Sequence, residues 1–508
     1  APQVTGDEAL GGGWLGLAPA TADARGKCFV DWQNDVTAPD LQLAVREGMR
    51  SIEHVKRYTT TGMATDQGKT SNLHALAIAS RALDTPLPAV GLTTFRAPYQ
   101  PVTFGSFAGY ARGDLFDPVR RTPIHAWAAQ RGAVFEPVGL WQRARYFPRT
   151  GEDMHAAVAR ECVAVRNGVG LFDASTLGKI EVVGPDAAEF LNRLYVNSWD
   201  KLAVGRCRYG ILLRDDGFVY DDGVVARTAA DRFHVTTTTG GAPRVLAMME
   251  DYLQTEWQEL KVWLTSTTEQ WAVIAVQGPR AREVIAPLVE GIDLDTAKFP
   301  HMSCARGRVA GVEALLFRVS FTGELGYEIN VPADFGLEVW KAVWQAGQAH
   351  GICPYGTETM HVLRAEKGYI IVGQDTDGTV TADDAGLSWA VGKNKADYLG
   401  LRSLAKPALQ AANRKQLVGL ATADPKFVLE EGSQVTATPG LKPPHAVIGH
   451  VTSSYYSAVL GRSVALALVE SGRSRMGQVL HVPSPHGEQA VTVTGPVFYD
   501  PKGERLHA

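Results

Sequence analysis

The chain has 508 residues, 45% hydrophobic and 20% charged, which is ordinary for a globular protein with its own core. The 50 Lys and Arg against 54 Asp and Glu leave a formal charge of −4, so a nucleic-acid partner is not predicted. Five scattered cysteines without a CxxC pair, and no apolar run near the roughly 18 residues of a membrane span, predict a cytoplasmic protein with no metal site, disulfide framework or membrane partner.

The first part of the chain is interpreted as a linker followed by a small mixed module. Residues 1–26 are rich in Gly and Ala, which is typical of a flexible linker within a longer polypeptide. Residues 27–122 form the module, with a short strand at 27–34 and helical apolar spacing from Leu43 to Val55. A second helix is predicted at 72–83 with Asn72 as its N-cap, and the Pro- and Gly-rich stretch 84–122 predicts irregular structure.

Residues 123–420 alternate helices with strand pairs, which predicts an α+β domain built from split β-α-β units. Within it, Gly217 is suited to the positive φ of a hairpin turn at 214–217. Residues 421–508 are short strands separated by turn signals, which predicts a C-terminal β-barrel or jelly-roll-like domain. The expected helices are 153–167, 185–195 and 333–350, and the expected strands are 178–183, 209–213, 222–227, 232–238, 271–277, 314–320 and 327–331.

Three carboxylates in predicted strands are the candidates for chemistry. Asp221 and Asp222 begin an apolar strand, and alternation places them on opposite faces, so one must point inward. The alternative is a pair that caps a turn. Glu328 stands inside a strand, where a carboxylate is disfavoured unless it is exposed or partnered. No P-loop, GxSxG, HExxH or strand-following GxGxxG occurs, so a dinucleotide fold within these residues is not expected.

Several motifs occur in an order and spacing typical of one family. They include VGLFDASTLGKIEVVGPDAAEFLNRL, DDGFVYDDGVV, FTGELGYEINVP and AEKGYIIVGQD. The stretch from about 123 to 505 resembles the aminomethyltransferase family, the T-protein of the glycine cleavage system. The segment EHVKRYTTTGMATDQGKTSN resembles the alpha subunits of heterotetrameric sarcosine oxidases, in which the folate part is the C-terminal portion of a longer chain. The resemblance implies a T-protein-like fold around a central folate cavity.

The resemblance also assigns roles to individual positions. Asp221 matches the aspartate beside the reactive folate nitrogens, Glu328 the glutamate that holds the pteridine ring, and Tyr209 a tyrosine that lines the pocket. Phe321 stands where the T-protein has a pocket tyrosine. Met360 stands where the T-protein has an arginine that contacts folate, which leaves the anchor of the glutamyl tail unassigned.

These residue types suit one-carbon transfer. A carboxylate such as Glu328 accepts hydrogen bonds from the pteridine amide N–H and amino group in a two-point contact. A buried aspartate stabilises an iminium cation and accepts the proton displaced when a folate nitrogen attacks. By resemblance, Asp221 would therefore serve as the electrostatic residue and general base, with Asp222 as the structural alternative.

The resemblance implies transfer of the one-carbon unit of oxidised sarcosine, a methyleneimine, to tetrahydrofolate, which gives 5,10-methylenetetrahydrofolate. Beta, gamma and delta subunits would be the partners, FMN and FAD would belong to the assembled complex, and NAD would bind a preceding half of the chain. The loop that carries Lys56, Arg57 and Lys69 is either part of the FMN phosphate site or an ordinary solvated basic loop.

Three alternatives share the same fold. The first is a stand-alone folate-dependent demethylase or aminomethyltransferase, against which the N-terminal module argues. The second is a non-catalytic folate-binding accessory protein of the iron–sulfur maintenance type. It carries a Cys in a KGC motif, where this chain has Tyr369. The third is a purely structural subunit, against which the presence of Asp221 and Glu328 argues.

Overall fold

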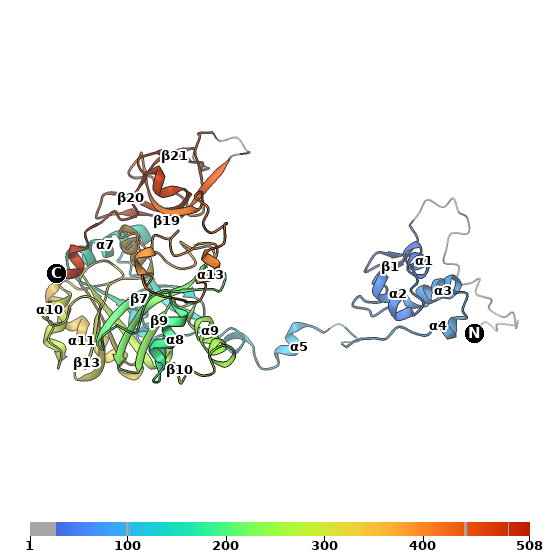
Figure 1. Ribbon diagram of the computed structural model, residues 1–508, viewed down its shortest axis with the longest axis horizontal. Coiled ribbons are helices and arrows are strands. Elements are labelled where there is room, and N and C mark those ends of the chain that lie inside the picture. Colours follow the sequence, from blue (N-terminus) through green and yellow to red (C-terminus); the bar gives the residue numbers. More distant parts are fainter. Residues whose placement is uncertain (1–26, 98–99, 101, 441–443, 445, 486) are drawn as a thin grey trace. The chain divides into compact units, whose positions relative to one another are not determined.

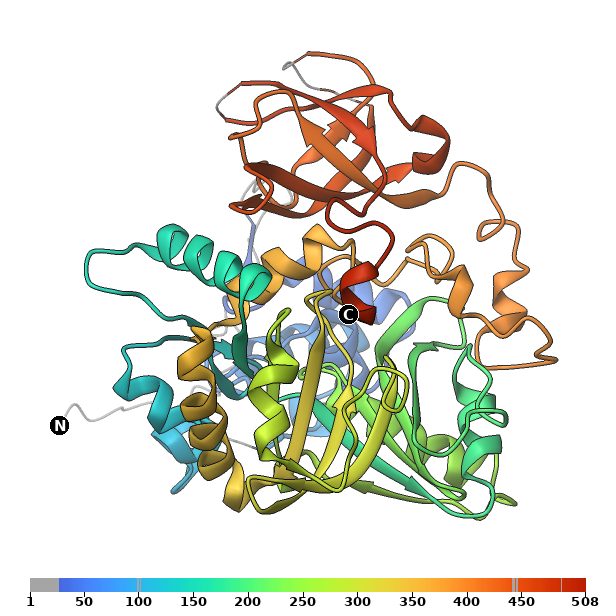
Figure 2. The same cartoon turned by 90° about the vertical axis from the view of Figure 1, so that its left-hand side faces the viewer.

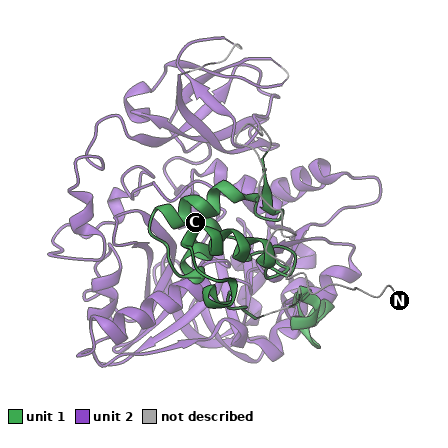
Figure 3. Ribbon diagram, turned by 90° about the vertical axis from the view of Figure 1, so that its right-hand side faces the viewer, with its two compact units in different colours: residues 1–118 green, residues 119–508 purple. Residues whose placement is uncertain are grey.

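A computed structural model describes residues 27–97, 100, 102–440, 444, 446–485 and 487–508. The chain divides into two compact units, residues 1–118 and 119–508 (Figures 1 and 3). The linker predicted at 1–26 lies outside the described residues.

The first unit is a small helical module with one hairpin. Its hydrophobic core is built around Leu41, Ala44, Val55 and Ala79. The helical pattern expected from Leu43 to Val55 divides into two helices, because Gly48 adopts φ 97° just after the first one ends. The elements are β1 (Phe29–Asp31), β2 (Val36–Thr37), α1 (Ala38–Arg46), α2 (Ile52–Thr59), α3 (Asn72–Leu83), α4 (Leu87–Val90) and α5 (Phe104–Ala108).

Helix α3 has the predicted bounds but a different cap. Ser71, not Asn72, occupies the N-cap position. The Asn72 side-chain amide instead donates to the Thr93 hydroxyl at 2.8 Å, which ties the helix start to the segment that follows α4.

The second unit contains one large sheet in the order β10-β6-β9-β8-β7-β13-β14-β15-β11-β5-β16, with β12 beside β13 (Figure 2). Neighbouring strands pair antiparallel, except that β16 runs parallel to β5. The strands are β5 (Gly170–Asp173), β6 (Gly178–Val183), β7 (Arg206–Leu213), β8 (Val219–Ala229), β9 (Arg232–Thr237), β10 (Trp263–Ser266), β11 (Trp271–Gln277), β12 (Val289–Glu290), β13 (Ser303–Val309), β14 (Val312–Arg318), β15 (Gly326–Pro332) and β16 (Cys353–Pro354). A separate hairpin joins β3 (Val134–Val138) and β4 (Trp141–Tyr146).

Helices cover one face of this sheet, which we call the outer face. In one cluster Phe190, Leu191 and Leu194 of α8 pack with Val182 and Val235 of the strands. A second cluster packs α6, α10 and α11 against β11, β14 and β15. Burying each such side chain contributes roughly 1.5–3 kcal/mol, so both clusters hold the sheet firmly. The helices of this unit are α6 (His125–Gln130), α7 (Met154–Asn167), α8 (Ala187–Leu194), α9 (Ala242–Thr255), α10 (Ala281–Ile285), α11 (Gly336–Gly347), α12 (Thr357–Glu366) and α13 (Leu401–Leu404).

The last part of the chain is a closed β-barrel, as predicted, and it lies above the large sheet in Figure 2. Its strand order is β17-β20-β19-β18-β21-β22, and its interior is aliphatic. Closure removes the exposed edges that an open sheet of this size would carry. The strands are β17 (Lys415–Thr422), β18 (Gln434–Thr436), β19 (Val447–Ser457), β20 (Arg462–Glu470), β21 (Val479–Val482) and β22 (Gln489–Thr494).

Candidate functional site

The face opposite the helix clusters, the inner face, carries polar and ionisable side chains. Residues that pair directly across antiparallel strands share a face, so the register identifies them. The ring of Phe317 on β14, which pairs with Glu328, lies 5.7 Å from the ring of His234 on β9, although β8, β7 and β13 separate these two strands in the sheet, so the sheet curls. The directly paired inner-face positions are Lys179 with Thr236, Glu181 with His234, Ala226 with His234, Tyr209 with Val224, and Phe317 with Glu328.

Asp222 and Tyr209 form one part of this face. The Tyr209 hydroxyl donates to Asp222 Oδ2 at 2.5 Å, and the Tyr209 ring stacks on Trp389 with centroids 6.0 Å apart. Burial raises the pKa of Asp222 to about 7, while the hydrogen bond from Tyr209 acts in the opposite direction. The Asp222 side chain nevertheless keeps partial access to solvent. We expect a side chain that is desolvated but still partly accessible to solvent to line a recess.

Asp221 points to the outer face instead. It is completely buried, and Oδ1 accepts from the backbone N–H of Asp222 at 2.9 Å. Its Oδ2 accepts from the Thr238 hydroxyl at 3.2 Å, in the turn that precedes α9. The turn approaches so closely that a Cβ added to Gly241 would lie 1.7 Å from Oδ2. The catalytic role predicted for Asp221 therefore does not fit the geometry, and Asp222 holds the inner-face position.

Glu328 lies on β15 with Lys179 facing it across the curled sheet. Its side chain is partly accessible, and none of its hydrogen bonds to other described residues involves the carboxylate. Burial raises the pKa of Glu328 to about 7, with Lys179 opposing that rise. Lys179 is completely buried, and its Nζ donates to the carbonyls of Ser175 at 2.8 Å and Leu177 at 2.6 Å. Burial lowers the pKa of Lys179 to about 7, against the pull of Asp173 and Glu328.

We call Tyr209, Asp222, Thr236 and Glu328, the accessible polar groups of this face, the inner-face site. The structure places Tyr209 and Glu328 on this face. Phe321 lies in the loop before β15 and stacks on Tyr369, with centroids 6.2 Å apart. Sequence reasoning missed Lys179, although a lysine within the apolar strand 178–183 was a visible signal.

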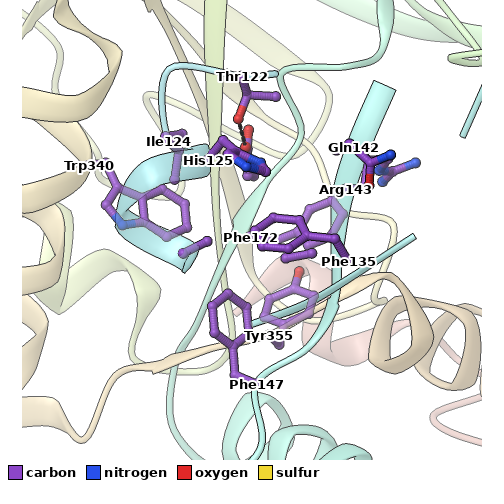
Figure 4. A pocket seen from close by; sticks show the side chains of 13 residues that line it. Thr122, Ile124, His125, Phe135, Gln142, Arg143, Phe147, Phe172, Trp340 and Tyr355 are labelled. Atoms are coloured by element: carbon purple, nitrogen blue, oxygen red, sulfur yellow. Dashed lines mark hydrogen bonds between the residues drawn. The ribbon is translucent and has the colours of Figure 1, made fainter. Parts of the chain in front are cut away.

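A small cavity lies beside this region (Figure 4). Its volume is about 20 Å³, and aromatic rings including Phe172 and Tyr355 line it, stacked with centroids 5.1 Å apart. Thr122 donates to Asp173 across its rim at 2.5 Å. A cavity of this size holds about one water molecule, so it is too small for a ring-bearing ligand.

In the first unit, the loop expected to meet a phosphate is only partly suited to that role. Lys56 is buried, and its Nζ donates to Glu53 at 3.1 Å and to the Thr94 carbonyl at 2.7 Å. Its charge is therefore used within the module.

Comparisons with known families place most of this chain in one family. The model of the GCVT N-terminal domain matches residues 124–395, and that of the glycine cleavage T-protein C-terminal barrel domain matches residues 415–500. The chain belongs to the aminomethyltransferase family. An aminomethyltransferase of Corynebacterium aurimucosum is 32% identical over 69% of this chain and 90% of its own length. The family resemblance expected from the sequence motifs is thus confirmed.

The fold agrees with a solved member of the family. The glycine cleavage system aminomethyltransferase T of Bartonella henselae superposes with a TM-score of 0.66, at 24% identity, over 75% of this chain and 98% of that one. The predicted α+β T-protein-like fold with its C-terminal barrel is therefore confirmed. Within the described residues, none of the helices is long and apolar enough to cross a membrane.

The N-terminal module extends the similarity beyond this family. Residues 25–110 match the model of the sarcosine oxidase A3 domain. The sarcosine oxidase alpha subunit of Corynebacterium sp. strain P-1 is 52% identical over 94% of this chain, and that of Rhizobium meliloti is 46% identical over 95%. The chain spans about half the length of these relatives, 50% and 49% respectively.

Proposed function

We propose that the inner-face site binds tetrahydrofolate, with Glu328 holding the pteridine ring and Asp222 beside the nitrogens that receive the one-carbon unit. One observation carries the proposal. Two carboxylates from strands far apart in the sequence share the inner face, keep access to solvent, and have pKa values raised to about 7 by burial. Carboxylates with perturbed pKa values that keep access to solvent are a mark of functional sites.

The chemistry assigns each carboxylate a different task. The Glu328 carboxylate, without a hydrogen bond among the described residues, is available to accept from an amide N–H and an amino group at once. Lys179 behind it supplies the positive charge that favours its ionised form. These contacts orient the ring rather than react with it.

Asp222 is assigned the electrostatic role that the resemblance gave to its neighbour. As a carboxylate it stabilises the cationic CH₂=N⁺ group of the iminium. When the first folate nitrogen attacks that carbon, a C–N bond forms, the C=N π electrons pass to the iminium nitrogen, and Asp222 accepts the proton that the folate nitrogen loses. Asp222 returns this proton to the amine nitrogen, whose bond to the carbon breaks so that it leaves as glycine, and the second folate nitrogen loses its own proton as it bonds to the same carbon. Tyr209 holds the carboxylate in one orientation through its 2.5 Å hydrogen bond. A Ser or Cys nucleophile is not required for this sequence of steps.

In the full-length protein we assign this chain to the folate-binding part of a sarcosine oxidase alpha-type subunit. Sarcosine would be oxidised at a flavin with partner subunits, and the methyleneimine passed to tetrahydrofolate to give 5,10-methylenetetrahydrofolate. The identity of 52% to such an alpha subunit and the A3-domain match support this assignment. The proposal includes beta, gamma and delta partners, FMN and FAD in the complex, NAD in a preceding half, and a cytoplasmic location.

The domain boundaries proposed for this chain are 27–122 for the module, 123–420 for the folate domain and 421–508 for the barrel. Arg57 remains a proposed phosphate-facing residue of the module. A stand-alone aminomethyltransferase is the second candidate, because the chain covers 90% of the length of the C. aurimucosum aminomethyltransferase. Methylene transfer without any partner subunit would favour that second candidate.

Calorimetric titration with tetrahydrofolate tests the proposal on the chain and on Glu328→Gln. We expect saturable binding by the wild type and at least about tenfold weaker binding by Glu328→Gln, because a charge-assisted hydrogen bond is worth roughly 1.5–3 kcal/mol. Glu338→Gln is the matched control, since Glu338 lies on α11 and pairs with Lys341 at 3.3 Å. Absence of wild-type binding, or equal binding by the two variants, would contradict the proposed site.

A further inference from the structure

Arg143 on β4 is a charged side chain that forms no ion pair with any described residue. Its guanidinium carbon lies 5.4 Å from the centre of the Phe172 ring. Its Nε is buried and has no hydrogen-bond partner, and the guanidinium forms neither an ion pair nor a hydrogen bond with any described residue. Burial lowers the pKa of Arg143, with Asp173 and Glu136 acting against that shift. A desolvated guanidinium without hydrogen-bond or ion-pair partners lowers the stability of the fold unless another group supplies those partners.

The acidic groups near Arg143 are already engaged. Asp173 accepts from the Thr122 hydroxyl through Oδ2 at 2.5 Å and from the Ser175 N–H through Oδ1 at 3.0 Å. Glu136 accepts from the Thr357 hydroxyl and lies 3.5 Å from Arg145.

Arg145, two residues along the same strand, shows the contrast. Its Nε and Nη2 each lie 3.2 Å from Glu358, besides the contact with Glu136. One strand therefore presents a paired arginine and an unpaired one. The unpaired charge is a property of Arg143 and not of the whole strand.

Arg143 and Met360, the position where the sequence lacks a tail anchor, both border the cluster that contains Phe172 and Tyr355. Met360 of α12 packs against the cluster that contains Phe172 and Tyr355, and Figure 4 shows those two rings with Arg143 at their edge. Burial, together with the charges of Arg364 and Arg143, lowers the pKa of His361 to about 3. Arg143 and the residues around Met360 therefore face the same region.

We propose that Arg143 binds the carboxylate-bearing tail of the folate substrate, in place of the arginine that this chain lacks at position 360. This inference rests on the proposed folate site. A planar guanidinium donates two parallel hydrogen bonds to a carboxylate, which a lysine cannot reproduce.

The test compares two ligands that share the pteridine ring. Tetrahydrofolate carries the benzoylglutamate tail and 6-methyltetrahydropterin does not. Calorimetry on the 508-residue chain measures both ligands with wild type, Arg143→Met, Arg145→Met and the double variant Arg143→Met/Met360→Arg. Arg145→Met is the matched control because it removes the same charge from the same strand.

We expect Arg143→Met to bind tetrahydrofolate at least about tenfold more weakly, with an unchanged affinity for the pterin, since only the tail loses its partner. Arg145→Met should leave both affinities unchanged. The double variant should recover most of the lost affinity, because an arginine at position 360 returns the charge from α12.

Other outcomes would overturn the assignment in distinguishable ways. An unchanged tetrahydrofolate affinity in Arg143→Met would exclude a tail contact while leaving the folate site intact. An equal loss for both ligands would place Arg143 in the fold or at the pteridine end. Failure of wild type to bind either ligand would defeat the proposed function itself, and this inference with it.

Discussion

Two groups of buried charges in the unit 119–508 behave in opposite ways. The first group joins α7 and α12 to the barrel. Arg166 Nη1 lies 3.0 Å from Glu324 and Nη2 lies 2.7 Å from Glu366, with all three side chains completely buried. Ser457 of the barrel donates to Glu366 at 2.6 Å, so one network spans both parts.

The second group consists of Asp222, Glu328 and Arg143, and it lacks such compensation. Neither carboxylate forms an ion pair with a described residue, and burial raises the pKa of each to about 7. Arg143 has no ion pair or hydrogen bond within the described chain. These are the groups that remain partly open to solvent.

The comparison distinguishes charges that hold the fold together from charges that are available to bind a ligand. A buried ion pair with full hydrogen bonding holds elements in register, and removing one partner leaves an uncompensated charge. A desolvated charge without a partner costs stability unless a ligand supplies the missing contacts, which is why such groups gather at binding sites. The following changes test this separation, from the largest expected effect to the smallest.

Arg166→Met should destabilise the protein by about 3–5 kcal/mol, because Glu366 would remain buried without its cation and Glu324 would keep only the longer 3.9 Å contact with Arg505. Urea unfolding of the chain measures this. Arg193→Met is the control, since its pair with Glu189 is exposed and is worth about 1 kcal/mol or less. Equal losses in the two variants would contradict the architectural role of the network.

Asp222→Asn should reduce the rate of 5,10-methylenetetrahydrofolate formation by about 10² or more while folate binding persists, because a general base contributes that much. The rate is measured in the protein assembled with its partners. Asp221→Asn should instead lower stability by about 1–3 kcal/mol through its lost turn contacts, with a smaller change in rate. The reverse pattern would return the catalytic role to Asp221.

The pH dependence of stability should report Glu328. Its pKa is about 7 in the folded protein against an ordinary 4.5, so the folded state holds the proton more tightly. Stability from this group is therefore present below about pH 4.5 and is lost as the pH rises to about 7. Glu328→Gln should flatten the decline in this window, as measured by urea unfolding at pH 4.5, 6 and 8. An unchanged slope would show that Glu328 is not desolvated.

Tyr209→Phe should have the smallest effect. Its hydroxyl stabilises the ionised form of Asp222, so its removal should raise the pKa of Asp222 further, by about one unit. The pH profile of methylene transfer should shift upward accordingly, with folate binding almost unchanged. An unchanged pH profile would show that the Tyr209 hydroxyl does not affect the pKa of Asp222.

Much of the fold followed from local pattern. The strands at 178–183 and 271–277 and the helix at 72–83 have their predicted bounds, because each carries a regular apolar period. Helix α9 and strand β13 were not predicted. Strand β8 begins at Val219, earlier than expected, with a register shift beside Leu212 and Leu213. Such a shift depends on the neighbouring strand, which local periodicity cannot reveal.

By itself, the sequence determined the α+β class, the barrel, the family motifs and the placement of Glu328 inside a strand, since these depend on residues close together in the chain. It also determined that Asp221 and Asp222 face opposite ways. Only the tertiary structure decided that Asp222 is the inner one, because helices α8 and α9 cover the other face. It alone showed that Arg143 forms no ion pair among the residues the structure describes, since burial and electrostatic pairing depend on residues far apart in sequence.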